Sequence, residues 1–133
     1  MRRWPLYGLV IALATAGCTS ANLAGNWAPP SAQLGGEDFP VSNFAGATLK
    51  LTESAYEFGG DKGTIAVIPK HTPAQMDIHG VQGPNKGRTI PAIYQLSSDS
   101  LVVCYQLGAG DRPKTFTSPK DSQVLLIRYK RVK

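Results

Sequence analysis

The sequence predicts an all-β protein: about eight short strands, antiparallel and connected up-and-down, that close into a small barrel. Two observations favour this class. Apolar and polar residues alternate in short runs, and clusters of Gly, Pro, Asn, Asp and Ser separate these runs at intervals of roughly 8–12 residues. A third is that no convincing amphipathic helix interrupts the pattern, so local antiparallel connections are expected throughout.

The first half of the chain supplies five of these runs. The segment from Ala28 to Phe44 is less regular, because Pro29-Pro30 and Gly35-Gly36 should break a strand, and we expect a short helical turn or a lid-like loop over one barrel mouth. A turn is predicted at 59–63, before the strand Thr64–Ile68. Pro69 to Pro73 should end that strand, because proline has no N–H to donate to a ladder. The five predicted strands are Leu23–Trp27, Thr48–Thr52, Tyr56–Phe58, Thr64–Ile68 and Ala74–His79.

The second half contains a clearer hairpin. Ser97-Ser98-Asp99-Ser100 lies between two β-rich runs, Thr89 to Leu96 and Leu101 to Leu107, which is typical of two strands joined by a turn. The loop before this hairpin, Gly80 to Gly87, is rich in Gly, Pro and Asn. A last strand is predicted at Val124–Tyr129.

The N-terminus has the features of an export signal. Arg2 and Arg3 precede an apolar run from Trp4 to Ala14, which is shorter than the roughly 20 residues that span a membrane. The ending Thr15-Ala16-Gly17-Cys18 resembles the lipobox of bacterial lipoproteins, and this resemblance implies that Cys18 is acylated and becomes the mature N-terminus. We therefore expect a signal peptide at 1–17, a lipidated tether at 18–22 and one barrel domain at 23–133.

The resemblance to lipoproteins also implies a location. Thr19 and Ser20 follow Cys18, without the aspartate that retains many Gram-negative lipoproteins at the inner membrane, so the outer membrane, facing the periplasm, is the expected site. The short tether predicts that the domain meets its ligand at the membrane face. An alternative is cleavage after Ala14-Thr15-Ala16, which would give a soluble periplasmic or secreted protein.

Charge and cysteine content exclude some classes. The 133-residue chain has a formal net charge of +5, and two of its cations lie in the signal. The remaining basic residues form no concentrated stripe, so nucleic acid is not an expected partner. Cys104 is the single cysteine after Cys18, so the domain can form no internal disulfide.

Several motifs resemble a known family. Gly25-Asn26-Trp27 matches the Gly-x-Trp of lipocalins, and the chain from Leu23 to Lys133 resembles a bacterial lipocalin-like domain of unknown function that is abundant in planctomycetes. The chain departs from that family in two places. Pro29-Pro30 stands where the family usually continues a strand, and Pro91-Ala92 stands where a glycine often precedes the Ile-Tyr pair. The other motifs are Gly83-Pro84-Asn85-Lys86-Gly87-Arg88-Thr89, Ile93-Tyr94-Gln95-Leu96 with Asp99, Leu101 and Cys104, Arg112-Pro113-Lys114-Thr115-Phe116, and Leu125 to Arg131.

The resemblance implies structural roles for Trp27 and Arg131. In lipocalin-like barrels a tryptophan of the first strand closes the narrow end under a basic side chain of the last strand. Period-two alternation puts Arg131 on the same face as Leu125, Ile127 and Tyr129, where it could stack on Trp27. Fraying of Arg131 into solvent is the alternative.

No residue pattern indicates catalysis, a metal or a cofactor. Cys104 lies among β-branched and aromatic neighbours, which favours a buried, unreactive thiol. Asp77 and His79 share one strand face, yet two ligands do not make a metal site. The loop from Gly83 to Thr89 lacks the spacing of a phosphate loop and is expected to be solvated.

Three function classes remain, in this order. The first is a non-catalytic, membrane-anchored envelope lipoprotein whose barrel binds a small apolar or amphipathic ligand or has a structural role. The second is a protein-binding lipoprotein, an inhibitor or immunity factor against a periplasmic enzyme, with Ala28 to Phe44 or Leu107 to Lys120 as contact loops. An enzyme is third. An open apolar mouth would favour the first class, and an interior without a cavity would oppose it; the expected interior residues are Leu49, Leu51, Phe58, Ile65, Tyr94, Leu101 and Val103.

Overall fold

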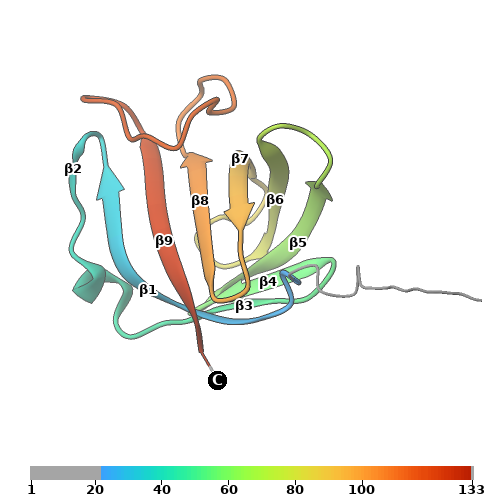
Figure 1. Cartoon of the computed structure of the whole chain (residues 1–133). Coiled ribbons are helices and arrows are strands. Elements are labelled where there is room, and N and C mark those ends of the chain that lie inside the picture. Colours follow the sequence, from blue (N-terminus) through green and yellow to red (C-terminus); the bar gives the residue numbers. More distant parts are fainter. Residues whose placement is uncertain (1–21, 133) are drawn as a thin grey trace, which may run out of the picture.

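The computed structural model describes residues 22–132 as a closed antiparallel β-barrel of eight strands with one short extra strand (Figure 1), so the predicted fold class is confirmed. The predicted signal peptide and Cys18 lie outside the described residues. The strands are β1 (Gly25–Leu34), β2 (Glu37–Asp38), β3 (Leu49–Leu51), β4 (Ala55–Phe58), β5 (Asp61–Ile68), β6 (Ala74–Gln82), β7 (Thr89–Leu96), β8 (Ser100–Gln106) and β9 (Val124–Val132).

Each strand from β3 to β8 pairs with the next one along the chain, as in an up-and-down barrel. The barrel closes through β1, which pairs with β3 on one side and β9 on the other. Figure 1 shows β1 (cyan) beside β9 (red). Trp27 lies in both ladders, opposite Leu49 of β3 and Arg131 of β9. The strand β2 pairs with the end of β1 alone.

The prediction that Pro29-Pro30 ends the first strand is wrong. Strand β1 continues through both prolines to Leu34, and its pairing with β9 shifts register between Ala28 and Ser31. The prolines therefore lie in a β-bulge, where a missing N–H interrupts little of the ladder. The expected short helical turn does occur, as a 3₁₀ turn over Val41–Phe44.

Strands β5 and β6 are longer than the sequence predicts. The predicted turn at 59–63 is confined to Gly59-Gly60, and β5 begins at Asp61. This extension requires Gly63, because a Cβ atom there would lie 2.0 Å from the carbonyl oxygen of His79 on β6. The result is that Asp61 belongs to the barrel wall rather than to a solvated turn.

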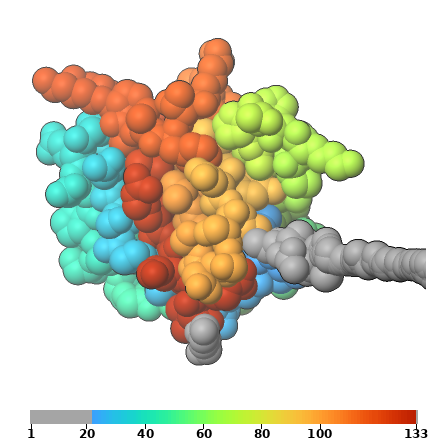
Figure 2. Space-filling view, viewed as in Figure 1, coloured from blue at the N-terminus to red at the C-terminus, as the bar shows by residue number. Residues whose placement is uncertain are grey.

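Two apolar clusters stabilise the barrel. The larger fills the interior and includes Trp27, Leu49, Leu101, Val103 and Tyr129, each at most 6% exposed. The smaller lies on the outer face of β7, β8 and β9, and its buried residues are Ile93, Cys104, Val124 and Leu126. Phe116, from the connection between β8 and β9, packs against this outer cluster. Figure 2 shows that connection, in orange, spread over one end of the strands.

The two ends of the barrel differ. One end holds the start of β1, the end of β9 and the turn between β7 and β8, and Trp27 fills it. The opposite end holds the 3₁₀ turn and the connections β4–β5, β6–β7 and β8–β9. We call these the closed end and the open end.

Candidate functional site

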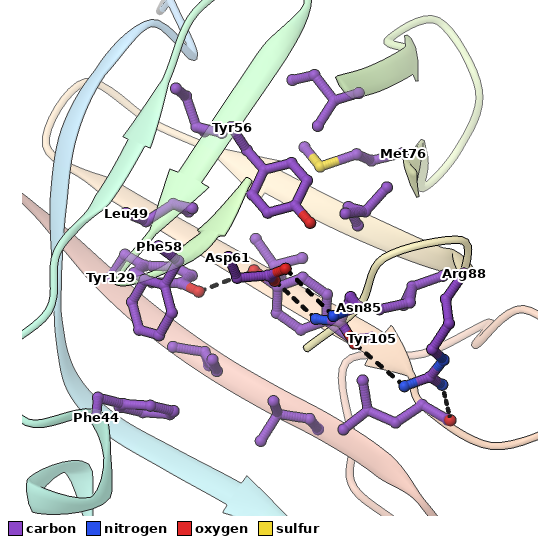
Figure 3. Close-up of a pocket in the computed structure, with 18 residues that line it drawn as sticks. Phe44, Leu49, Tyr56, Phe58, Asp61, Met76, Asn85, Arg88, Tyr105 and Tyr129 are labelled. Carbon is purple, nitrogen blue, oxygen red and sulfur yellow. Dashed lines mark hydrogen bonds between the residues drawn. The ribbon is translucent and has the colours of Figure 1, made fainter. Parts of the chain in front are cut away.

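A cavity of about 240 Å³ occupies the barrel interior and reaches the open end. Of the seven expected interior residues, Leu49, Leu51, Phe58, Ile65 and Val103 line it, while Tyr94 and Leu101 belong to the interior cluster without lining the cavity. Figure 3 shows the lining. It comprises Phe44, Leu49, Leu51, Tyr56, Phe58, Asp61, Ile65, Met76, Ile78, Asn85, Arg88, Ile90, Val103, Tyr105, Leu107, Leu125, Ile127 and Tyr129.

Aromatic rings form much of one wall. Phe44 of the 3₁₀ turn packs edge-on against Phe58 of β4, with ring centroids 5.2 Å apart and an interplanar angle of 78°. Phe39 also contacts Phe44, in a tilted arrangement with centroids 5.5 Å apart. Edge-to-face aromatic pairs are favourable at these separations, so this short turn is held against the cavity rather than free as a lid.

Two tyrosines that line the cavity form a polar pair. The hydroxyls of Tyr105 on β8 and Tyr129 on β9 lie 2.8 Å apart and share a hydrogen bond. Burial raises the pKa of both phenols above the ordinary value of 10.0. Both groups are therefore neutral hydroxyls at physiological pH, and each keeps spare hydrogen-bonding capacity.

Tyr56 presents the cavity with a third hydroxyl. Its side chain comes from β4 and is 7% exposed, and its buried oxygen has no hydrogen-bond partner among the described residues. Burial, then the negative charge of Asp61 and the closeness of its carboxylate to the hydroxyl, raise the pKa of Tyr56 to about 12. A buried hydroxyl without a partner is costly, by about 1–3 kcal/mol, so this group marks a place where a ligand would be stabilised.

Asp61, Asn85 and Arg88 form the polar edge of the cavity at the open end. Asn85 donates to the Asp61 carboxylate from its side-chain amide, at 2.7 Å, and from its backbone N–H, at 3.4 Å. Arg88 donates to the side-chain oxygen of Asn85 at 3.2 Å and also to the carbonyl of Leu107. A neutral amide thus joins the carboxylate to the cation.

The loop that carries Asn85 folds back onto β6 because of Gly80. A Cβ atom at Gly80 would lie 1.9 Å from the carbonyl oxygen of Asn85, so only glycine permits this approach. Backbone hydrogen bonds from Gly80 to Arg88 and from Gly87 to Gly80 then hold the loop. The expectation of a merely solvated loop is wrong for Asn85, which contributes to the cavity wall.

The closed end shows where Trp27 and Arg131 lie. Trp27 is fully buried, and its indole N–H donates to the carbonyl of Leu23 at 3.0 Å. The Arg131 guanidinium carbon lies 4.3 Å from the centroid of the Trp27 ring. Arg131 also donates to the carbonyls of Ser98, Ala24 and Asn22 at 2.9, 3.0 and 2.7 Å. The guanidinium is therefore stacked and bonded rather than frayed.

The other sequence candidates lie outside the cavity. Cys104 is fully buried in the outer cluster, and burial raises the pKa of its thiol above the usual range. His79 is exposed and forms a hydrogen bond with the hydroxyl of Thr89. Within residues 22–132 no three His, Cys, Asp or Glu side chains gather as a metal site would require.

The connection between β8 and β9 is fastened to the barrel by Arg112. Its guanidinium donates to the carbonyls of Met76 and Ala92, at 3.1 and 3.0 Å, and pairs with Asp77 at 2.6 Å. These carbonyls lie beside Pro91, which has no N–H for the ladder. Strands β6 and β7 nevertheless pair without a register shift around Pro91, and Asp77 is the ion-pair partner of Arg112.

Sequence reasoning missed the polar side of the cavity. Period-two alternation could have identified two of these residues. Tyr105 lies two positions after the inward-facing Val103, and Tyr56 lies two positions before the inward-facing Phe58. Asp61 and Asn85 carry no such periodic pattern, because their turn-like sequence conceals a strand start and a folded-back loop.

Comparisons with protein-family models, with curated proteins and with solved structures found no match to this chain. Among the described residues, no helix has the length and apolar character needed to cross a membrane. The cavity and its polar edge are the features from which a function can be argued.

Proposed function

We propose that this chain is a lipid-anchored protein of the bacterial cell envelope whose barrel binds a small apolar or amphipathic molecule. The observation that carries the ligand-binding role is the interior cavity, which has apolar walls and a few convergent polar groups at its open end. Binding sites for small molecules generally have this composition. The proposed role requires no catalytic group and no cofactor.

The size of the cavity limits the ligand. A dry protein cavity of about 150 Å³ accommodates benzene, with its six carbon atoms. By proportion, the 240 Å³ cavity holds a molecule of about ten non-hydrogen atoms. The proposed ligand is therefore closer to a medium-length alkyl compound than to a membrane phospholipid.

A series of linear alcohols tests the ligand-binding role. Titration calorimetry on the purified protein should show affinity that increases with chain length up to about ten non-hydrogen atoms and then falls, because longer chains exceed the cavity. Leu125→Trp adds an indole to the cavity lining and should abolish binding. Val81→Trp places the same side chain at an exposed position of β6, 55% accessible, and should leave binding unchanged.

The same measurement separates this role from the protein-binding alternative. If no alcohol binds and both tryptophan variants behave like the wild type, the ligand-binding proposal is wrong. A stoichiometric envelope protein retained by the immobilised chain would then favour an inhibitor or immunity factor. The predicted contact segment Ala28 to Phe44 is less suited to that role than expected, since its first seven residues belong to β1.

The proposed anchor rests on the sequence ending at Cys18. Three acyl chains on this residue would make release from a membrane negligible, at about 0.8 kcal/mol per buried methylene. Labelled palmitate should be incorporated by the wild type and by Cys104→Ala, and lost in Cys18→Ala. Incorporation that survives Cys18→Ala would contradict acylation of this residue, and absence of label from the wild type would favour the soluble periplasmic or secreted alternative.

A further inference from the structure

We propose that the ligand of this cavity is a small organic cation, an alkylammonium whose charged head lies between Asp61 and Tyr56 while its apolar body fills the barrel. This inference rests on the proposed ligand-binding role and specifies its chemistry. It follows from the charge of one wall residue, the unused hydroxyl facing the same space and the aromatic character of the surrounding walls.

Asp61 gives the cavity a negative charge that forms no ion pair with a cation of residues 22–132. The ion pairs among residues 22–132 are Lys62 with Glu57 and Arg112 with Asp77, and Asp61 belongs to neither. Among the described residues, both hydrogen bonds that its carboxylate accepts come from Asn85, which is neutral. A carboxylate has about four acceptor positions, so Asp61 can accept further hydrogen bonds, and its charge favours a positive donor.

Tyr56 supplies a second acceptor at the same place. Figure 3 shows its hydroxyl and the Asp61 carboxylate pointing toward the same part of the cavity. The side chain is 7% exposed and its oxygen lacks a partner in the described region. A primary ammonium has three N–H donors, which suits a carboxylate with a neighbouring hydroxyl oxygen.

The aromatic walls favour a cation as well. Phe44, Tyr56, Phe58, Tyr105 and Tyr129 all line the cavity. The faces of such rings attract ammonium groups, most strongly where water is excluded. An anion receives no such stabilisation from ring faces, and the uncompensated Asp61 would repel it.

Arg88 is the feature that could select an anion instead. Its guanidinium lies beyond Asn85, where it donates to the Asn85 side-chain oxygen and to the carbonyl of Leu107 (Figure 3). Two acceptors already engage it, and it is exposed. An anionic head would have to remain at this outer edge, whereas an ammonium can enter next to Asp61.

A set of ligands with one apolar body and three heads tests the inference. Octylammonium, octanol and octanoate are titrated into the purified protein at pH 7. We expect octylammonium to bind about tenfold tighter than octanol, which corresponds to about 1.4 kcal/mol, and octanoate to bind most weakly.

Two variants identify the residue responsible. Asp61→Asn removes the charge and keeps an oxygen that can accept from Asn85, so octylammonium should fall to the affinity of octanol while octanol changes less than about twofold. Glu57→Gln makes the same charge change on a residue paired with Lys62, and it should leave the tenfold preference intact. If Asp61→Asn does not fold, Tyr56→Phe should reduce the preference by about threefold.

The outcomes separate this inference from the proposed function. Equal affinities for the three heads, or tightest binding of octanoate, would overturn the cation proposal and leave the ligand-binding role standing. Absence of binding for all three compounds would contradict the ligand-binding role itself. A preference for octylammonium that persists in Asp61→Asn would overturn the assignment of the head group to Asp61.

Discussion

At the residue scale, Arg131 joins three separate parts of the closed end. It stacks on Trp27 with the guanidinium carbon 4.3 Å from the ring centroid, and it donates to carbonyls of the N-terminal segment and of the β7–β8 turn. A cation over an indole contributes about 0.5–2 kcal/mol. The carbonyl bonds add to this, so one side chain links the N-terminal segment, β9 and the turn at Ser98.

We therefore expect Arg131→Ala to lower the free energy of unfolding by about 2 kcal/mol in urea denaturation, because it removes both the stacking and the hydrogen bonds. Arg128→Ala is the matched control, since Arg128 lies on the same strand with its side chain exposed. That control should change the free energy of unfolding by less than about 0.5 kcal/mol. Equal effects of the two substitutions would contradict a role specific to Arg131.

The cavity tyrosines differ in what their hydroxyls contribute. Tyr129→Phe should destabilise the protein by about 1 kcal/mol, because it leaves the buried Tyr105 hydroxyl without its partner. Tyr56→Phe should leave stability unchanged or raise it, because the hydroxyl it removes has no partner among the described residues. Thermal unfolding of both variants at pH 7 checks this difference, and a loss of stability in Tyr56→Phe would contradict it.

Alkaline pH should weaken the fold through the same residues. In the unfolded chain a tyrosine ionises near pH 10, whereas the folded protein raises the pKa of Tyr56 to about 12. The folded state then holds a proton that the unfolded state loses, so stability is complete below pH 10 and falls between pH 10 and 12. One such group lowers the free energy of unfolding by about 1.4 kcal/mol per pH unit in that window.

Urea denaturation at pH 8, 9, 10 and 11 measures this slope. Tyr94, Tyr105 and Tyr129 also have raised pKa values, so wild type should lose stability steeply above pH 10. Tyr56→Phe should reduce the loss at pH 11 by about the share of one group. An unchanged slope in that variant would show that Tyr56 ionises alike in both states.

At the element scale, the long β8–β9 connection depends on Arg112. The ion pair with Asp77 is partly exposed, with the side chains 26% and 41% accessible, so it contributes less than about 1 kcal/mol. The bonds to the carbonyls of Met76 and Ala92 come from a charged donor, at 3.1 and 3.0 Å, and do not involve Asp77. The carbonyl bonds should therefore matter more than the ion pair.

Two substitutions separate these contributions. Arg112→Ala should lower the free energy of unfolding by about 2 kcal/mol, because it removes the carbonyl bonds and the ion pair together. Asp77→Ala should lower it by less than about 1 kcal/mol, because the carbonyl bonds remain. Chemical denaturation of the two variants gives the comparison, and a larger loss for Asp77→Ala would contradict it.

The strands show what alternation can and cannot predict. The period-two runs from Leu49 to Tyr129 identified every barrel strand after the first, because each has one face in the interior. The first strand was predicted too short, since Pro29-Pro30 normally ends a strand and a bulge opposite β9 cannot be read from local sequence. Asp61 was assigned to a turn because its glycine neighbours resemble one.

The site was predictable only on its apolar side. Inward positions such as Leu49, Ile65 and Val103 follow from alternation, and all three line the cavity. The pairing of Asp61 with Asn85 joins residues 24 positions apart, and it depends on the close approach of the loop at Gly80. Contacts of this kind arise from tertiary packing, which no local pattern encodes.

At the scale of the whole molecule, the barrel is polarised. Both ends of the described chain lie at the closed end, where Asn26 pairs with Val132, whereas the cavity reaches the opposite end through Asp61, Asn85 and Arg88. In Figure 1 the C-terminus and the β8–β9 connection lie at opposite ends of the barrel. If Cys18 is acylated, the closed end is held next to the lipid and the mouth of the cavity opens away from the membrane. The short tether alone predicts binding at the membrane face, so the position of the mouth changes that expectation.

This orientation can be measured with a fluorophore at either end of the lipidated protein in vesicles. Ser98→Cys labels the turn at the closed end and Lys86→Cys the loop at the open end, both exposed. A seven-residue strand such as β8 is about 23 Å long and, at a tilt of about 40°, extends roughly 18 Å along the barrel axis, while the five tether residues reach at most roughly 17 Å. Nitroxide-labelled lipids should therefore quench the probe at Ser98 more than the probe at Lys86.

With Cys18→Ala the difference should vanish, because both probes then remain in solution. Stronger quenching at Lys86 in the lipidated protein would mean that the mouth faces the bilayer, and that the ligand is taken from the membrane.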